Sequence, residues 1–192
     1  MLRGSEMSTF EVVVLTASHP HWPSQLTTRL ENATPASLAA IGYISLLANR
    51  KIALFCSVRC PGDAILAAQD AARRWRDEGR CIISGFHSPV EKECLDVLLG
   101  GASPLIICPA RSLHGMQFPQ GWKKPIEAGR LLLLSFFPSS ERRLTAELAQ
   151  RRNECVAALA DEAFIAYITP GGQTARIADM LKQWHVPAAS LA

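Results

Sequence analysis

From Lys51 onward, short apolar runs alternate with longer amphipathic stretches, and this alternation limits the possible folds more than any other feature of the chain. The runs are IALFC (52–56), CIIS (81–84), PLIIC (104–108), LLLLS (131–135) and FIAYI (164–168). Polar, Gly or Pro residues bound each run, as they usually bound buried parallel strands. The alternation predicts an α/β fold of the doubly wound kind, with a mainly parallel sheet and helices on both faces.

Four amphipathic stretches in this part of the chain are predicted to form helices. They are DAILAAQDAARRWRDEG, VEKECLDVLLGG, WKKPIEAG and ERRLTAELAQRRNECVAALAD. The first has ordinary start and stop signals, because Pro61, Gly62 and Asp63 stand at its beginning and Gly79 at its end. Apolar side chains in the last stretch mark the helix side that is expected to be buried: Leu144, Leu148, Cys155, Ala158 and Leu159.

The residues that precede this pattern are interpreted as an N-terminal extension. Residues 1–50 are expected to form a subdomain packed on a core of residues 51–192. Within the extension, the sequence indicates a strand at Val12–Leu15 and a helix near Pro35–Leu47. A chain of 192 residues is long enough for one well-packed domain and short for two, so the extension is not expected to be an independent fold.

Composition and charge exclude several classes of protein. Hydrophobic residues make up 48% of the chain and charged residues 19%, so a folded globular protein is expected rather than a disordered one. The longest apolar run, LLLLSFF at 131–137, is too short to cross a bilayer. The N-terminus has no secretory signal pattern, which favours a cytoplasmic location. The formal charge of +3 is a weak indication of a polyanionic ligand.

Neither a metal site nor a catalytic triad is predicted. Six cysteines are too few for a disulfide scaffold, so reduced thiols are expected. Cys56 and Cys60 are spaced C-x₃-C, but the sequence contains no second Cys or His pair with ligand spacing. Ser84, His87 and Glu91 crowd within eight residues of one loop and lack the strand-turn-helix elbow of a nucleophilic serine.

Ligands of doubly wound sheets bind beyond the carboxyl ends of the strands, where loops and helix N-termini supply backbone N–H groups. The functional loops are therefore expected at 57–63, 85–90, 109–121, 136–141 and 169–174.

The last of these loops, within TPGGQTARIAD, is the most informative. Its two glycines allow close backbone approach, and Gln173 and Thr174 open a helix whose first N–H groups lack internal partners, which suits a phosphate or another anion. The first loop, FCSVRCPGD, offers Ser57 and Arg59 to an anion. Neither loop is a Walker A loop or a G-x-G-x-x-G turn, so ATP hydrolysis and NAD binding are not supported.

The turn at Ser84 and Gly85 has a structural explanation as well as a functional one. Gly permits a left-handed turn, and Ser can cap the start of a helix. Arg151 and Arg152 lie on a predicted helix, where an arginine usually belongs to a solvated face.

The motifs occur in an order that is more specific than any one of them. LTASHPHWPSQLTTRL leads in, followed by LFCSVR, ISGFHSPVEKECL, GRLLLLSFFP, QRRNECVAALAD and PGGQTARIA. Together they resemble the Rossmann-like core of the DprA/Smf family, the DNA-processing proteins of natural transformation, which is related to LOG-type nucleotide-binding domains. The resemblance covers roughly residues 12–182.

This resemblance implies a protein that binds single-stranded DNA in DNA processing, recombination or uptake, without catalytic turnover and without a cofactor. It also implies a homodimer and, as a possible partner, a RecA-like recombinase. No membrane association is expected.

The DNA- or phosphate-binding residues are expected in the loops and on the arginine-bearing helix: Ser57, Arg59, Ser84, Gly85, Phe86, His87, Arg152, Asn153, Gly171, Gly172, Gln173 and Thr174. Glycines would let the backbone approach a phosphate closely, and Arg59 and Arg152 would supply positive charge. Base stacking would need exposed rings, for which the candidates are Phe86, His87, His114 and Phe118.

The chain departs from the family pattern at several positions. Cys56 and Val58 replace the Gly and Arg of the first motif, and Glu154 replaces the second Arg of the arginine motif. Glu91 stands in place of an Asp, and two further replacements affect a His and a Glu of the pattern: Leu95 and Phe136.

Two other functions stay open at this stage. One is a sensor of a free nucleotide or a nucleotide-derived signal, which would use the same anion loops. The other is a LOG-like nucleoside-monophosphate phosphoribohydrolase, whose Gly-rich turn PGGQT resembles. In that enzyme a glutamate follows the turn, and Ile177 occupies its position here, which removes the carboxylate needed for acid–base work at the ribose.

Overall fold

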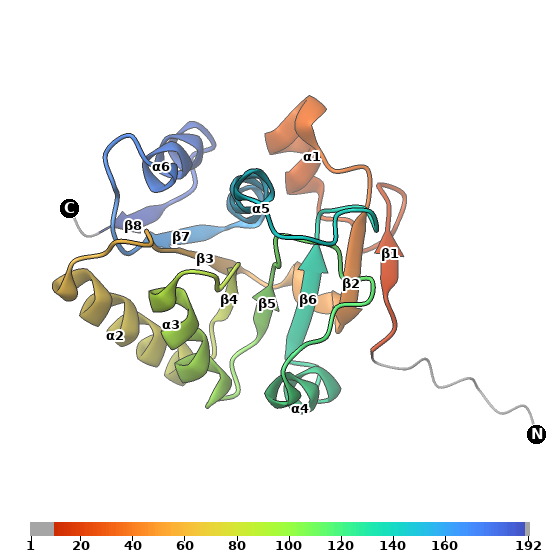
Figure 1. Cartoon of the computed structure of the whole chain (residues 1–192), viewed down its shortest axis with the longest axis horizontal. Helices are drawn as coiled ribbons and strands as arrows, with labels where there is room; N and C mark the ends of the chain where they lie inside the picture. Colours follow the sequence, from red (N-terminus) through yellow and green to blue (C-terminus); the bar gives the residue numbers. More distant parts are fainter. Residues whose placement is uncertain (1–9, 191–192) are drawn as a thin grey trace, which may run out of the picture.

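Within residues 10–190, which the computed structural model describes, eight strands form one sheet (Figure 1). The strands are β1 (Val13–Leu15), β2 (Leu38–Gly42), β3 (Lys51–Phe55), β4 (Cys81–Ser84), β5 (Leu105–Ile107), β6 (Leu131–Ser135), β7 (Glu162–Ile165) and β8 (Ala188–Ser190). Their order across the sheet is β1-β2-β6-β5-β4-β3-β7-β8. All neighbours from β6 to β8 pair in parallel, whereas β1 and β2, and β2 and β6, pair antiparallel.

Helices cover both faces of this sheet. They are α1 (Ser24–Leu30), α2 (Gly62–Glu78), α3 (Pro89–Leu99), α4 (Lys123–Glu127), α5 (Ala146–Leu159) and α6 (Gln173–Gln183), with short 3₁₀ helices at Glu31–Ala33, Ile44–Ala48 and Gln120–Trp122. Figure 1 shows α2, α3 and α4 on one face and α1, α5 and α6 on the other. The predicted doubly wound α/β fold with a mainly parallel sheet is confirmed.

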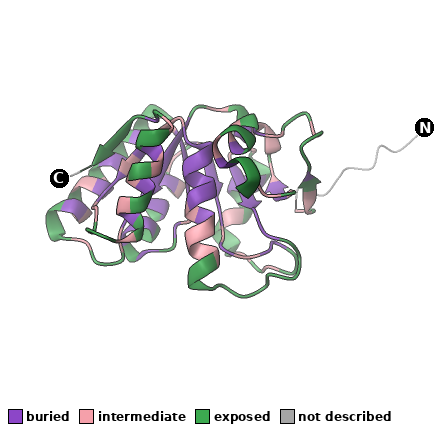
Figure 2. Ribbon diagram, turned by 90° about the horizontal axis from the view of Figure 1, so that it is seen from above, coloured by how far each residue is buried: buried purple, intermediate pink, exposed green. Residues whose placement is uncertain are grey.

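Two apolar layers, one on each face of the sheet, make up the core. In β4, Ile83 belongs to the layer under α5, and Ile82 belongs to the layer under α2 and α3. Successive side chains of a strand point to opposite faces, so a strand covered on both faces reads as a continuous apolar run. Figure 2 shows the second half of α5 buried, and the buried residues of this helix include Arg152 but not Arg151.

The N-terminal part of the chain contributes to the same sheet. The strand expected at Val12–Leu15 is present as β1, and β1 and β2 extend the sheet beyond β6. Arg29 of α1 donates from Nη1 to the carbonyl oxygens of Ala158 (2.9 Å) and Ala160 (2.7 Å) at the end of α5. A cation at a helix C-terminus satisfies carbonyl groups that lack intrahelical partners.

The predicted helix near Pro35–Leu47 is wrong, because β2 and the 3₁₀ helix Ile44–Ala48 occupy this segment. The first four residues of β2 are buried between β1 and β6, so the apolar run reflects cover on both faces of a strand. β2 ends at Gly42, whose φ is 107°, and a Cβ atom at this position would collide with the carbonyl oxygen of Leu131.

Helix α5 begins later than the amphipathic pattern predicts. The Thr145 side chain caps it, since Oγ1 accepts a hydrogen bond from the N–H of Leu148 at 3.1 Å. Leu144 precedes this cap and is 48% exposed, so its assignment to the buried side is wrong. The last three residues predicted for that side, Cys155, Ala158 and Leu159, are buried. In the described part of the chain, no helix is long and apolar enough to cross a membrane.

Candidate phosphate-binding pocket

A pocket of about 480 Å³ opens at the carboxyl edge of the parallel strands. The loops after β3, β4 and β7 and the first turns of α5 and α6 surround it. Several of the predicted site residues line it: Ser57, Arg59, His87, Arg152, Asn153, Gly172, Gln173 and Thr174. The structure therefore brings together loops that are distant in the sequence, at the edge of the sheet where ligands of such folds bind.

Hydroxyl groups tie the first loop to the last. The Ser57 hydroxyl donates to the carbonyl oxygen of Tyr167 (3.1 Å) and accepts from the Thr169 hydroxyl (2.9 Å). Thr174 Oγ1 lies 3.0 Å from Ser57 Oγ and accepts from the Thr169 N–H at 3.0 Å. β7 ends before the predicted run 164–168 does, so Tyr167 lies in the loop, two residues beyond Ile165, which pairs with Phe55 at the end of β3. These hydrogen bonds hold the first and last loops of the pocket together.

Glu91 ties the second loop to the first. Its Oε1 accepts from the Cys56 N–H at 3.0 Å, and its Oε2 accepts from the N–H groups of His87 (2.8 Å) and Ser88 (3.2 Å). The Ser88 hydroxyl in turn accepts from the Glu91 N–H, which completes a capping box at the start of α3. The carboxylate is buried, and its hydrogen bonds hold the pocket loops in place.

Arg152 lines the pocket but is 3% exposed, so it is not on the solvated helix face that its position on a helix suggests. Its Nη1 donates to the carbonyl oxygen of Cys108 (2.9 Å) and its Nε to Oδ1 of Asn153 (2.8 Å). Burial lowers the pKa of Arg152, and the nearby Glu91 carboxylate opposes this shift. A guanidinium nevertheless stays charged in proteins, so the wall of the pocket is cationic.

Arg152 also explains the glycine of the Ser84-Gly85 turn. A Cβ atom at Gly85 would overlap the Arg152 guanidinium, so close packing requires glycine at this position. The left-handed residue of the turn is Phe86, with a φ of 47°, and not Gly85. The expected reason for the glycine, a left-handed turn, is therefore wrong.

Four predicted residues do not line the pocket. Ser84 is 1% exposed and structural, because its hydroxyl donates to the Leu54 carbonyl (2.8 Å) and accepts from the Phe86 N–H (3.2 Å). Phe86 is buried in the core, so its proposed stacking role is wrong. Gly85 lies behind the arginine, and Gly171 lies outside the pocket lining, with a φ of 68°. Their roles are in shaping the turns.

The other stacking candidates differ in exposure. His87 is exposed at the pocket and His114 is exposed in the loop after β5. Phe118 is half-buried and stacks on Phe10, with ring centroids 5.8 Å apart. Of the four candidate rings, only His87 combines exposure with a place in the pocket lining.

The N-terminus of α6 faces this pocket. Gly172 is its N-cap, and Gln173 and Thr174 form its first turn, as the sequence predicts. A glycine cap carries no side chain to accept the first N–H groups of the helix, so these donors are available to an anion. The Asn153 side chain, which donates to Gln173 Oε1 at 3.3 Å, links this turn to α5.

Sequence reasoning missed part of the lining. The residues concerned are Cys56, Val58, Ser88, Glu91, Ala146, Ala149 and Thr169. Thr169 could have been predicted, because it is the first residue of the loop 169–174, which the sequence already indicated as a binding loop. The contribution of Ala146 and Ala149 depends on where α5 starts, and the pattern placed that start too early.

The pocket thiol offers no obvious chemistry. Burial, followed by a hydrogen bond with Cys60, raises the pKa of the Cys56 thiol, which keeps it protonated and weakly nucleophilic at neutral pH. Among residues 10–190, no group of three or more His, Cys, Asp or Glu side chains is placed to hold a metal ion.

The fold and this pocket define a Rossmann-like α/β protein with a cationic site among the loops at the carboxyl edge of its sheet. The sequence profile of DNA recombination-mediator protein A matches residues 13–182. The protein belongs to this family, as the order of its sequence motifs predicts.

Solved structures share the fold. DNA processing protein A from Streptococcus pneumoniae superposes with a TM-score of 0.77 at 16% identity, over 95% of this chain and 63% of that one. The protein of the same name from Helicobacter pylori gives 0.74 at 21% identity, over 97% and 83%. A molybdenum cofactor binding protein from Rippkaea orientalis gives 0.53 at 10% identity, over 74% and 76%.

These similarities establish the fold, and function has to come from the site. The chain spans 63% of the length of the S. pneumoniae protein. No curated protein matches the sequence significantly.

Proposed function

We propose that this protein binds single-stranded DNA through its backbone phosphates, as part of DNA processing or recombination, and that it does so without catalytic turnover. The observation that carries the proposal is the meeting of Arg152, Arg59 and the α6 N-terminus in one pocket. Two cations and a set of backbone N–H donors are the groups that proteins use to hold phosphate. The H. pylori DNA processing protein A, which shares this fold, binds single-stranded DNA.

The pocket supports binding better than catalysis. Glu91 is the carboxylate in its lining, and both oxygens already accept backbone N–H groups. Ile177, at the position of the hydrolase glutamate, is 3% exposed and packs in the core. A phosphoribohydrolase needs a carboxylate that is free to exchange a proton with the substrate.

Replacing the two cations tests the proposal. Arg59→Ala removes an exposed side chain, and Arg152→Ala removes the buried one, so the first variant keeps the test valid if the second unfolds. Each should weaken binding of a fluorescent oligothymidine roughly tenfold, because a charged hydrogen bond contributes about 1.5–3 kcal/mol. Each should also lower the slope of log K against log salt by roughly 0.7, the value for one phosphate of a single strand.

The matched control is Arg73→Ala on α2, where Arg73 is paired with Asp70 at 2.7 Å on an exposed face. It should bind like the wild type. Equal affinities and slopes for the wild type and the folded Arg59→Ala and Arg152→Ala proteins would refute a phosphate role for this pocket. Base release from nucleoside monophosphates, measured with the same preparation, would instead establish the hydrolase.

The proposal includes a homodimer and a recombinase partner, which the family resemblance suggests. Sedimentation at tens of micromolar tests the dimer, since a dimer and a monomer differ twofold in mass. Co-sedimentation of a RecA-like recombinase with the protein on oligothymidine tests the partner.

A further inference from the structure

The arginines of the described chain fall into two groups, according to whether an acidic side chain lies within ion-pair distance. Those that pair with an acid are Arg50, Arg73, Arg74, Arg76, Arg80, Arg151 and Arg176. Arg29 and Arg130 instead donate to backbone carbonyl groups. The arginines without an acidic partner among residues 10–190 also include the pocket residue Arg152 and four loop residues, Arg59, Arg111, Arg142 and Arg143. Of these four, Arg142 donates from Nε to the Ser139 carbonyl oxygen at 3.4 Å.

The four loop arginines lie at one edge of the sheet. Arg59 follows β3, Arg111 follows β5, and Arg142 and Arg143 follow β6. The strands lie in the order β3-β4-β5-β6, so the loops form a row that starts at the pocket and spans three strand spacings, about 14 Å. Cationic side chains in a row are suited to successive phosphates of one strand.

Hydrogen bonds join the loops that carry Arg111, Arg142 and Arg143 to each other and to the pocket. The Ser112 N–H donates to the Glu141 carbonyl oxygen at 2.7 Å, which holds the loops after β5 and β6 together. The bond from Arg152 to the Cys108 carbonyl joins the loop after β5 to the pocket wall. Ala146, which follows shortly after Arg143, is itself part of the pocket lining. The row is thus continuous with the pocket.

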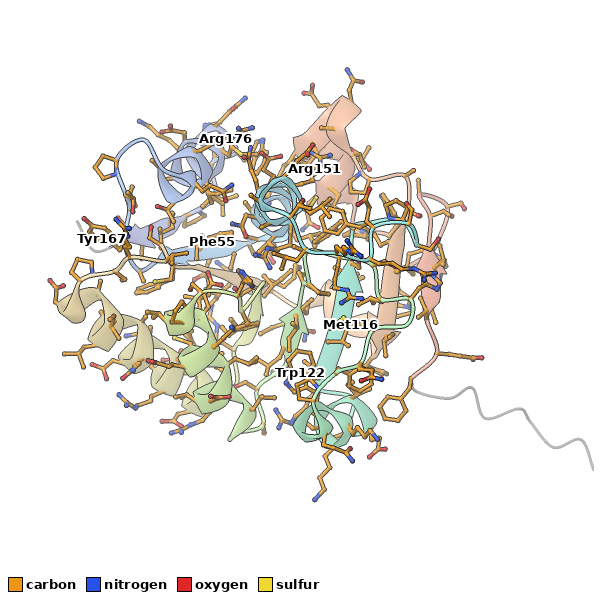
Figure 3. All side chains as sticks on the ribbon, viewed as in Figure 1. Phe55, Met116, Trp122, Arg151, Tyr167 and Arg176 are labelled. Carbon is orange, nitrogen blue, oxygen red and sulfur yellow. The ribbon has the colours of Figure 1, made fainter. Side chains whose placement is uncertain are left out.

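A second hollow leads out of the pocket along α5 and α6, and a carboxylate neutralises the arginines that line it. A hollow of about 640 Å³ shares Ala146 and Gln173 with the pocket and contains Arg151 and Arg176. Figure 3 shows these two arginines on the neighbouring helices α5 and α6. The Glu154 side chain, 10% exposed, pairs with Arg176 at 2.9 Å and with Arg151 at 3.3 Å.

We propose that a nucleic acid strand held in the pocket continues across the loops after β5 and β6, over Arg111, Arg142 and Arg143, and that Glu154 closes the route along α5 and α6. The inference rests on the proposed function and deepens it. It makes the ligand a strand of several nucleotides rather than a free nucleotide, because the unpaired charges extend beyond one pocket.

The test compares two double variants, each of which removes two arginines. The ligands are thymidine monophosphate and oligothymidines of two and of roughly 12 nucleotides, a length within the range of single-strand sites. Arg142→Ala/Arg143→Ala should bind the long oligothymidine about tenfold more weakly than the wild type. Its salt slope should fall by roughly 1.4, for two lost phosphate contacts. Its affinity for the dinucleotide should not change. Arg142 and Arg143 are exposed, so their removal should not disturb the fold.

The matched control, Arg151→Ala/Arg176→Ala, should bind all three ligands like the wild type. Glu154→Gln should tighten binding of the long oligothymidine and raise its salt slope, because it frees two arginines while an amide of similar shape keeps its place. Circular dichroism checks the folding of each variant.

The outcomes distinguish a failure of the proposed DNA binding from a failure of the strand path alone. If the wild type binds the monophosphate as tightly as the long oligothymidine, the proposed function fails and the strand path fails with it. If the wild type prefers the long ligand but the two double variants weaken equally, or only Arg151→Ala/Arg176→Ala weakens, the proposed function stands and the path is overturned. Loss of affinity in Arg142→Ala/Arg143→Ala alone supports the path.

Discussion

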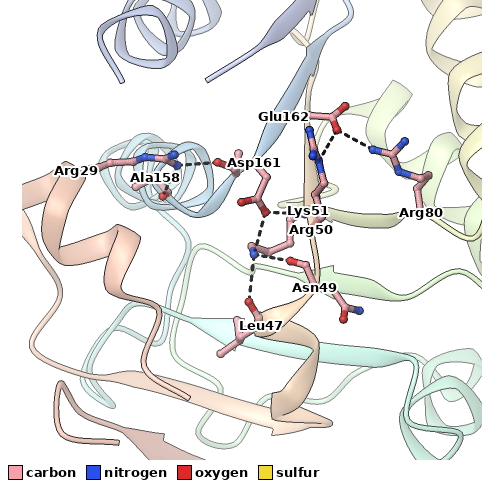
Figure 4. A network of polar contacts seen from close by, with 10 residues as sticks. Arg29, Leu47, Asn49, Arg50, Lys51, Arg80, Ala158, Asp161 and Glu162 are labelled. Atoms are coloured by element: carbon pink, nitrogen blue, oxygen red, sulfur yellow. Dashed lines mark hydrogen bonds and ion pairs between the residues drawn. The ribbon is translucent and has the colours of Figure 1, made fainter. Parts of the chain in front are cut away.

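The two edges of the parallel sheet differ in whether their cationic side chains are paired with acidic ones. At the amino edge, Lys51 is 2% exposed, and its Nζ contacts Asp161 Oδ2 (3.1 Å) and the carbonyl oxygens of Leu47 (3.1 Å) and Asn49 (2.7 Å), as Figure 4 shows. Glu162 holds Arg50 and Arg80 beside it, each at 2.8 Å. At the carboxyl edge, by contrast, arginines lie in loops without acidic partners among the described residues.

Cavity size alone would favour the amino edge over the candidate pocket. A hollow of about 650 Å³ at the amino edge includes Lys51 and Asp161 and exceeds the 480 Å³ of the carboxyl pocket. Its buried cation is already neutralised, so a phosphate entering there would meet Asp161. The carboxyl pocket also contains a carboxylate, Glu91, but both of its oxygens accept backbone N–H groups, and Arg59 in the same lining has no acidic partner among the described residues. The difference teaches that unpaired arginines, rather than volume, single out the carboxyl pocket as the candidate phosphate site.

The largest expected effect comes from breaking the network at the amino edge. Asp161→Ala leaves the Lys51 ammonium buried without its counter-ion and removes the acceptor of the Lys51 N–H (2.8 Å). We expect the free energy of unfolding to fall by about 3 kcal/mol, which is typical when one partner of a buried pair is lost. Urea unfolding measures the change. A loss below about 1 kcal/mol would mean that the two carbonyl groups suffice to hold the ammonium.

Two measurements on the same edge sharpen this result. Glu162→Gln, which weakens the solvent-exposed pairs with Arg50 and Arg80, should cost less than about 1 kcal/mol. Oligothymidine affinity of folded Asp161→Ala should equal that of the wild type, since the network lies at the opposite end of the strands from the pocket.

The next effect in size concerns the carboxyl edge, where Gly85→Ala places a methyl group on the Arg152 guanidinium. Overpacking of this kind costs about 2 kcal/mol, and the arginine must move. We therefore expect lower stability together with weaker oligothymidine binding, although no ligand contact is removed. Gly62→Ala is the control, because a Cβ atom there meets open space. It should bind like the wild type and be equally stable or more stable by up to about 1 kcal/mol. Unchanged binding by Gly85→Ala would show that Arg152 need not be held in this position.

The fold could be predicted largely from local patterns. Runs such as 52–56 and 131–135 are apolar because both faces of each strand are covered, and their spacing alone indicates the parallel sheet. β2 escaped prediction because Leu38–Ile41 are also good helix formers, and its position between β1 and β6 decided the outcome.

The sequence predicted which loops form the candidate site, but not which side chains in it contact one another. The edge of the sheet follows from topology, so the sequence alone places Ser57, Gln173 and Thr174 together. The reason for Gly85 depends on Arg152, and the effect of Glu154 depends on Arg176, a residue of another helix. Such pairs are set by tertiary packing, which periodicity does not encode.

The smallest expected effect is a difference in alkylation between a thiol at the amino edge and a thiol at the carboxyl edge. Cys81, at the amino edge, is buried, and its burial raises the pKa of the thiol to about 11, although nearby Lys51 opposes the shift. Cys60, in the loop of the carboxyl pocket, is only partly buried. An alkylating reagent at pH 8 should therefore label Cys60 in the native protein, and Cys81 only when the chain unfolds. Labelling of both thiols at one rate would remove this distinction between the edges.

The Cys81 thiol should also make the protein less stable as the pH rises above about 8.5. In the unfolded chain a thiol loses its proton near pH 8.5, whereas Cys81 in the fold keeps it until about 11. Between these values the unfolded state binds fewer protons, so the stability present below pH 8.5 declines as pH rises, by at most about 1.4 kcal/mol per pH unit for this thiol. Cys81→Ala should flatten the decline in urea unfolding between about pH 9 and 10.5. An unchanged decline in Cys81→Ala would mean that burial beneath the amino-edge network does not hold the proton on this thiol, and the contrast between the two edges would then rest on charge alone.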